Sequence, residues 1–81
     1  MFYVIEISTG DPSIAGKAIY EHATLTEATA VFHQKLSTAL KSDMYESELV
    51  MVIDQGGIVL NHEYYADLNA ERGTVESEIQ L

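Results

Sequence analysis

The chain has 81 residues, with 13 acidic and 4 basic side chains, a net charge of -9 and no cysteine. This composition excludes a disulfide framework, a thiolate nucleophile and a cysteine-based zinc site. The acidity disfavours direct binding to nucleic acid or to anionic lipid, and no segment approaches the ~20 apolar residues of a membrane span. We therefore expect one small cytoplasmic domain with no direct nucleic-acid or membrane partner.

The first elements are two strands joined by a loop. Phe2 to Thr9 alternates and is rich in β-branched and aromatic residues, and Lys17 to Ala23 predicts a weaker second strand. The segment between them has the glycines of a phosphate-binding loop. However, five residues separate those glycines, Ala18 stands where a magnesium-binding hydroxyl is needed, and a strand follows instead of a helix. The sequence GDPSIAG therefore predicts a turn.

One helix follows. Thr24 and Glu27 have the spacing of a capping box, and apolar residues then recur at helical spacing to about Ser42. Lys35 and Lys41 lie in its C-terminal half, where cations complement the helix dipole.

The second half of the chain predicts a hairpin and a tail. Tyr45 to Asp54 and Ile58 to Tyr65 alternate around the turn sequence QGG. The order is β-β-α-β-β, which predicts an α+β fold with a four-stranded antiparallel sheet and one helix packed on one face. We assign residues 1–65 to this single domain and residues 66–81 to an acidic, loosely ordered C-terminal tail.

Strict alternation divides the strand residues between two faces. The more apolar set predicts the face under the helix, where it meets Phe32 and Leu36: Tyr3, Ile5, Ile7, Leu49, Met51, Ile53, Ile58 and Leu60. The other set mixes valines with carboxylates and predicts an uncovered face: Val4, Glu6, Glu46, Glu48, Val50, Val52, Val59 and Glu63.

This mixed face is the predicted binding site. A four-residue loop between the last two strands would place Glu48 opposite Glu63, and like charges across a ladder are unfavourable. Either these side chains extend into water and serve solubility, or a basic partner lies between them. We predict partner binding through Glu6, Glu46, Glu48, Glu63, Val50, Val52 and Tyr20, with the exposed valines favouring a homodimer.

The sequence shows no assembled catalytic or metal-binding set. His22, His33 and His62 are scattered over three elements, no serine has the setting of a nucleophile, and the chain has no dedicated calcium loop. We predict a protein that is not an enzyme and that uses no metal or cofactor.

The run from Gly10 to Asp54 resembles a group of short hypothetical proteins from prophages and mobile elements of Gram-positive bacteria. The likeness is carried by AGKA at Ala15 to Ala18, FHQKL at Phe32 to Leu36 and YESEL at Tyr45 to Leu49. It implies a phage setting, in which small acidic proteins are often inhibitors or assembly accessories, and it transfers no functional residues.

We therefore expect an accessory protein that binds a basic protein surface, for example as an inhibitor of a nucleic-acid-guided host-defence nuclease. The alternative is a protein that sequesters a nucleotide signal at a homo-oligomer interface. The phosphates would then need cations, and only Lys17, Lys35, Lys41 and Arg72 are available.

Overall fold

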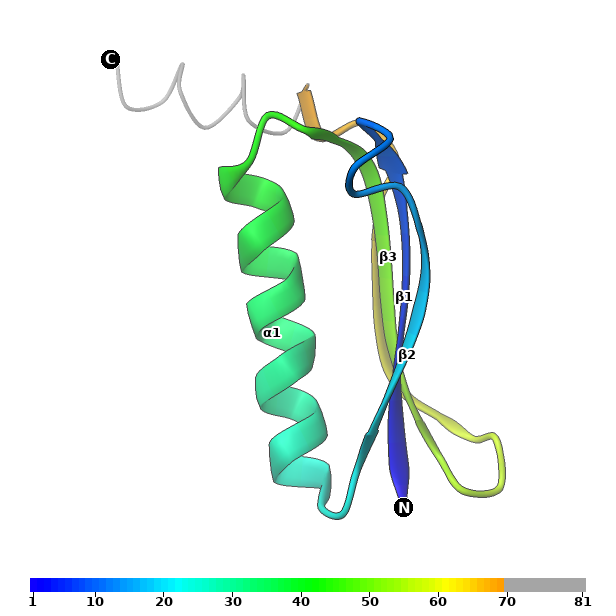
Figure 1. Cartoon of the computed structure of the whole chain (residues 1–81). Coiled ribbons are helices and arrows are strands. Elements are labelled where there is room, and N and C mark those ends of the chain that lie inside the picture. The colour runs from blue at the N-terminus through cyan, green and yellow to red at the C-terminus, as the bar shows by residue number, and fades with distance from the viewer. Residues whose placement is uncertain (70–81) are drawn as a thin grey trace, which may run out of the picture.

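A computed structural model describes residues 1–69 of the chain. It contains the strands β1 (Phe2–Gly10) and β2 (Gly16–His22), the helix α1 (Leu25–Lys41), and the strands β3 (Tyr45–Asp54) and β4 (Val59–Tyr65). The strands form one antiparallel sheet in the order β2-β1-β3-β4. This confirms the predicted α+β fold and its β-β-α-β-β order, with strand and helix ends within a residue of those expected (Figure 1).

The loop between β1 and β2 is a turn, as the sequence predicts. The carbonyl of Asp11 accepts hydrogen bonds from the backbone N–H groups of Ile14 and Ala15, and the Asp11 side chain accepts one from Ser13 N–H. Gly10 leaves β1 with a φ of 140°, and a Cβ there would collide with the backbone carbonyl oxygen of Met44. Glycine is therefore needed where the hairpin meets the start of β3.

The helix α1 begins and ends as its sequence predicts. Thr24 is the N-cap, and its hydroxyl accepts a hydrogen bond from Glu27 N–H at 3.1 Å. Ser42 is the C-cap, and its N–H donates to the Thr38 carbonyl. One stripe of the helix is buried, and it consists of Ala28, Phe32, Leu36 and Ala39.

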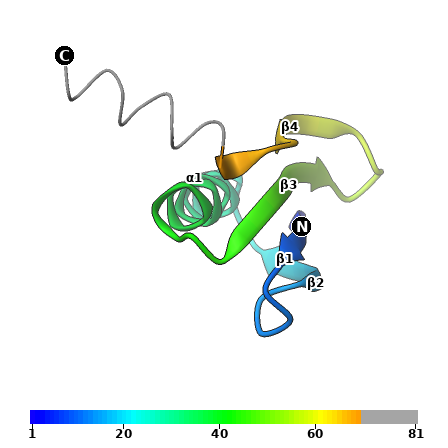
Figure 2. The ribbon, with the colours of Figure 1, turned by 90° about the horizontal axis from the view of Figure 1, so that it is seen from above.

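The helix connects two parallel strands. β2 and β3 both run antiparallel to β1 and lie on either side of it, so α1 crosses over β1 between them. Figures 1 and 2 show the helix on one side of the sheet only. In a crossover of this kind, the handedness of the connection decides which face of the sheet the helix covers.

The covered face is the one that the sequence assigned to the uncovered side. The core contains Val4, Val50 and Val52 under Phe32 and Leu36, all of them buried. Most of the predicted core residues of the strands belong to the other face and are half-buried: Tyr3, Ile5, Ile7, Leu49, Met51 and Ile53. The remaining two, Ile58 and Leu60, are exposed beside the last turn. The face assignment was wrong because both sets of alternating residues are apolar enough to form a core.

The domain extends beyond the predicted boundary at Tyr65. Leu68 is fully buried, and Figures 1 and 2 place the segment after β4 beside the C-terminal end of α1. The rest of the predicted tail, residues 70–81, lies outside the described residues. Within residues 1–69, no helix is long and apolar enough to span a bilayer.

Candidate functional site

Two glutamates lie beneath the helix on neighbouring strands. Glu6 of β1 and Glu48 of β3 belong to the covered face, and the two residues are 9% and 0% exposed. Ser8 is directly opposite Glu48 in the ladder, and Glu6 is opposite Val50. The two carboxyl groups are therefore diagonal neighbours, close enough for long side chains to interact.

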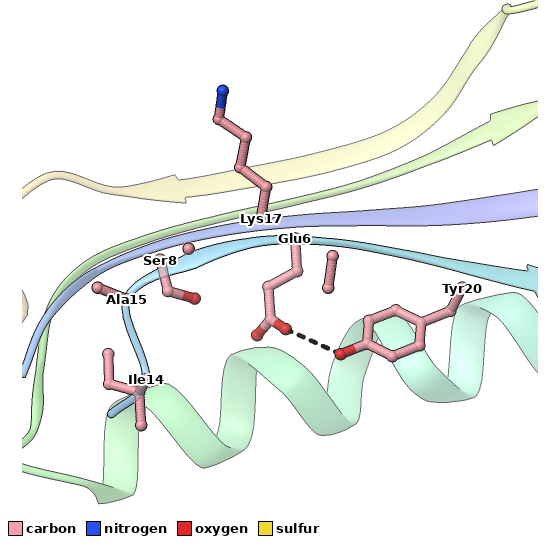
Figure 3. Close-up of a pocket in the computed structure, with 8 residues that line it drawn as sticks. Glu6, Ser8, Ile14, Ala15, Lys17 and Tyr20 are labelled. Carbon is pink, nitrogen blue, oxygen red and sulfur yellow. Dashed lines mark hydrogen bonds between the residues drawn. The ribbon is translucent and has the colours of Figure 1, made fainter. Parts of the chain in front are cut away.

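Each carboxyl group has its own polar partners. Ser8 Oγ donates a hydrogen bond to Glu48 Oε1 at 2.5 Å. The Tyr20 hydroxyl donates to Glu6 Oε1 at 3.3 Å, the contact drawn in Figure 3. Lys35 reaches down from α1, with Nζ 3.9 Å from Glu6 Oε1 and 4.5 Å from the centre of the Tyr20 ring. The helix is thus held to the sheet by a polar cluster as well as by apolar packing.

The electrostatics of the cluster favour one bound proton. The pKa of Glu48 is raised to about 8; burial is the largest cause, and the neighbouring carboxyl group of Glu6 acts in the same direction. Glu48 Oε2 is buried and has no hydrogen-bond partner, whereas Glu48 Oε1 accepts the hydrogen bond from Ser8. The hydrogen bond from Ser8 and the charge of Lys35 act in the opposite direction on the same pKa.

The pKa values of two neighbouring groups, Lys35 and Tyr45, are also shifted. A hydrogen bond with Tyr20 raises the pKa of Lys35, and Glu6 adds to that shift, so the ammonium keeps its charge. Burial raises the pKa of the Tyr45 hydroxyl, and the nearby carboxyl groups of Glu6 and Glu48 strengthen the effect. The cluster therefore combines one cation with two acidic groups, of which Glu48 is neutral at neutral pH.

A pocket opens beside Glu6, between β2 and the β1–β2 turn. Its volume is about 180 Å³, and its lining comprises Glu6, Ser8, Ile14, Ala15, Gly16, Lys17, Ala18 and Tyr20. In Figure 3 the carboxylate of Glu6 points toward the helix, whereas the Lys17 side chain extends away from it on the other side of the strands. A pocket with a carboxylate in its wall disfavours a phosphate group, so it gives no support to the nucleotide-binding alternative.

The structure separates the residues of the predicted binding face. Glu6, Glu48, Val50 and Val52 lie beneath α1, so the prediction that they form an uncovered face is wrong. Their place was misassigned because the crossover puts the helix over the even-numbered residues of β1 and β3. Tyr20 is half-buried against the core, and only the carboxylates of Glu46 and Glu63 are exposed.

The predicted register of the last hairpin also changes. Ile53 pairs with Val59, and an irregularity between Val52 and Ile53 shifts the ladder, so Glu48 is opposite Tyr65 and Glu63 is opposite Val50. The irregularity follows the turn, in which Asp54 Oδ1 accepts hydrogen bonds from Gly56 N–H and Ile58 N–H at 2.9 Å. The expected repulsion between Glu48 and Glu63 is therefore replaced by the contact between Glu48 and Glu6.

Sequence reasoning missed the roles of Ser8, Lys35 and Tyr45 in the cluster. A signal for Lys35 was present, because it follows Phe32 by three residues and so shares the buried side of the helix. Ser8 likewise continues the alternation of Val4 and Glu6 in β1.

Within residues 1–69, no group of three or more histidine or acidic side chains is placed to hold a metal ion. Comparisons of the chain with protein-family models, with curated proteins and with solved structures find no match.

Proposed function

We propose that the protein is a non-enzymatic accessory protein of the phage or mobile-element type, which acts by binding a partner protein with a basic surface. The observation that supports this proposal is the position of the exposed carboxylates. Four of them lie where β1 and β4 end and β3 begins, and we call them the acidic end: Asp11, Asp43, Glu46 and Asp67.

The register explains why these side chains gather. The N–H of Asp11 donates a hydrogen bond to the carbonyl of Met44, which joins the turn after β1 to the start of β3. β4 ends opposite the first half of β3, so Asp67 follows at the same end. Glu63 lies further along the sheet, on the helix side of β4 opposite Val50, and is exposed. The acidic end is thus built from three separate segments of the chain.

Of the three lysines within residues 1–69, Lys41 in the last turn of α1 is the one adjacent in sequence to this region, two residues before Asp43. Lys35 is engaged with Glu6 and Tyr20, and Lys17 extends from β2 on the opposite side of the sheet from Glu6. A concentration of negative charge speeds the approach of a basic partner and fixes its orientation. Because Glu6 and Glu48 are buried, the acidic end and Glu63 take over the role that the sequence assigned to the mixed face.

The concrete version of the proposal is occupation of the basic channel of a nucleic-acid-guided nuclease. Such a channel carries the positive charge that nucleic acid requires, and an acidic surface competes for it. The cellular setting in this proposal rests on the resemblance of Gly10 to Asp54 to prophage proteins.

The test is affinity capture of the tagged full-length chain from phage-infected host cells, followed by binding measurements with the purified captured protein. We expect the triple variant Asp43→Asn, Glu46→Gln and Glu63→Gln to lower the affinity at least about tenfold and to flatten its dependence on salt, because each lost charge pair weakens steering and docking.

A matched pair of single substitutions, each removing one charge, provides the control. Glu46→Gln, in the acidic end, should weaken binding. Glu27→Gln, at the exposed start of α1, should leave it unchanged. If the triple variant binds the captured protein as tightly as the parent at both low and physiological salt, the acidic end serves solubility only and the proposal fails.

A further inference from the structure

The face of the sheet opposite α1 has no cover within residues 1–69, and it is apolar. None of its side chains is buried, and Ile19 is 70% exposed. We call this surface the open face, and its members are Tyr3, Ile5, Ile7, Lys17, Ile19, Glu21, Leu49, Met51, Ile53, Val59, His62 and Tyr64.

The registers arrange these side chains in rows across the strands. The middle row runs Ile19, Ile5, Met51, His62. The row toward the acidic end runs Lys17, Ile7, Leu49, Tyr64, and the row on the other side runs Glu21, Tyr3, Ile53, Val59. Apolar and aromatic side chains therefore fill the centre of the face, and the charged ones lie at the β2 edge.

The extent of the open face is that of an interaction surface. Four strands spaced ~4.8 Å apart, with about six residues each at ~3.3 Å, cover roughly 380 Å² before the side chains are counted. The largest contiguous apolar patch on a small monomeric protein commonly has this size and is often functional. Because the side chains stand out from the sheet and interdigitate on packing, the area that a second sheet would remove from water is larger.

Charge restricts the kind of partner that fits this face. The whole chain carries -9, yet the open face contributes one cation, Lys17, and one anion, Glu21, beside His62. A strongly basic or strongly acidic partner would find little to pair with there. A second copy of the chain approaches through this face without bringing like charges together, and the acidic end and Glu63 then stay at the outside.

The order of residues along β2 makes the face self-complementary. Lys17 and Glu21 lie on either side of Ile19, two residues away in each direction. A two-fold axis that runs across the strands along the middle row places each β2 over the β2 of the second copy in the opposite direction. Ile19 then meets Ile19 of the partner subunit, and Lys17 meets Glu21 of the partner subunit, twice.

The same axis pairs the remaining rows well. Ile7 and Leu49 lie over Tyr3 and Ile53 of the other copy, so that apolar side chains meet apolar ones. An axis along the strands would instead place β2 over β4 and set Lys17 against Tyr64 and Glu21 against Val59, leaving both charges without a partner.

We propose that two copies of the chain pack face to face through the open face, about a two-fold axis across the strands, with Lys17 and Glu21 exchanging charge pairs between the copies. The product is a four-layer assembly in which two sheets are enclosed by two helices. This association is independent of the partner binding proposed above, since it uses a different surface.

The first experiment is sedimentation of the full-length chain between about 1 and 100 µM, which spans the usual range of specific association. We expect a dimer. Ile19→Arg should raise its dissociation constant at least about tenfold, because a side chain on the axis meets its own copy and like charges repel. This variant makes the net charge of the chain less negative, which reduces the overall repulsion between two copies. Loss of the dimer therefore cannot be attributed to net charge. A monomer at 100 µM for the parent chain overturns the proposal.

The second experiment tests the axis by charge reversal. Lys17→Glu alone and Glu21→Lys alone should each weaken the dimer at least about fivefold, because each creates two like-charge contacts. The double variant K17E/E21K should return to within about twofold of the parent, since every pair is restored with its signs exchanged. A dimer whose single variants associate normally, or whose double variant is not rescued, has a different interface and overturns the proposal.

The matched control is Glu63→Lys, which changes the net charge as Glu21→Lys does but lies on the helix side of β4. It should leave the dissociation constant unchanged. Far-ultraviolet circular dichroism of every variant shows whether the fold is intact, and the exposure of Ile19, Lys17 and Glu21 makes these positions tolerant of substitution.

Discussion

The two faces of the sheet differ in a way that reverses the usual relation between polarity and burial. The face under α1 contains two carboxyl groups and a hydroxyl, whereas the open face is occupied by isoleucine, leucine, methionine and tyrosine. A sheet that is apolar on its uncovered side is typical of strands that are enclosed on both sides. On the proposal above, the single chain is half of a packed unit, whereas the polar groups under the helix have partners within the core.

The largest expected effect is the loss of the folded state when a charge is placed on the face covered by α1. Val50→Arg or Val52→Arg places a charge in the core, at a cost of about 5 kcal/mol, which is comparable with the total stability of a small domain. We expect either variant to be unfolded by circular dichroism at 25 °C.

Ile19→Arg supplies the contrast, because it places the same side chain on the open face. It should keep the folded spectrum and lose only the dimer. A folded, monomeric Val52→Arg variant would instead mean that the valines face outward and that the assignment of the two faces is reversed.

The next effect concerns the proton on Glu48. Its folded-state pKa of about 8 lies above the ordinary value of 4.5, so the folded chain binds this proton between those values and the unfolded chain does not. The stabilisation is therefore fully present below about pH 4.5 and is lost as the pH rises toward 8. We expect the free energy of unfolding, measured with urea at fixed protein concentration, to fall by a few kcal/mol across this window from this group.

Glu48→Gln should flatten that dependence and make the protein more stable than the parent at pH 9. A glutamine keeps an oxygen for Ser8 Oγ and offers an amide N–H to Glu6. Glu63→Gln is the control, because it removes an exposed carboxylate and should keep the parent's slope. An unchanged slope in Glu48→Gln would show that Glu48 does not carry the proton in the folded protein.

The smallest effect tests what makes a position important for stability. We expect cover by the helix, and not only the direction of the side chain, to decide how much a substitution changes the free energy of unfolding. Glu63 is opposite Val50 and points to the helix side of the sheet, but it lies on β4 and is exposed. Glu63→Lys should change the free energy of unfolding by less than about 0.5 kcal/mol. A loss of 2 kcal/mol or more in urea unfolding would show that the helix side of β4 is part of the core.

Much of this architecture could be predicted from the sequence. Local signals identify every element: the capping residues Thr24 and Glu27, the turn around Asp11 and Gly16, and the alternation of Tyr45 to Asp54. These signals depend on a few neighbouring residues, which is why the strand and helix ends were close to those observed.

The sequence does not show in the same way which face of the sheet the helix covers. That choice depends on the strand order and on the handedness of the crossover through α1, and both faces offered enough apolar side chains to form a core. Once the face was misassigned, Glu6 and Glu48 appeared as surface groups and their contacts with Ser8, Tyr20 and Lys35 could not be anticipated. The register of β4 was mispredicted for a local reason, since the pairing shifts at the irregularity beside Ile53, next to the Asp54 turn.

The central pairing of β1 with β3 has a consequence for how the chain folds. The hairpins β1–β2 and β3–β4 and the helix form from neighbouring residues, but β1 and β3 are joined only after the chain has closed a loop of some forty residues, from Ser8 to Glu48. Closing that loop costs entropy before any contact repays it, so we expect the joining of the two halves to be the slow step. Glu48 leaves water in this same step, and protonation of one carboxyl group is thereby linked to the speed of folding as well as to its equilibrium.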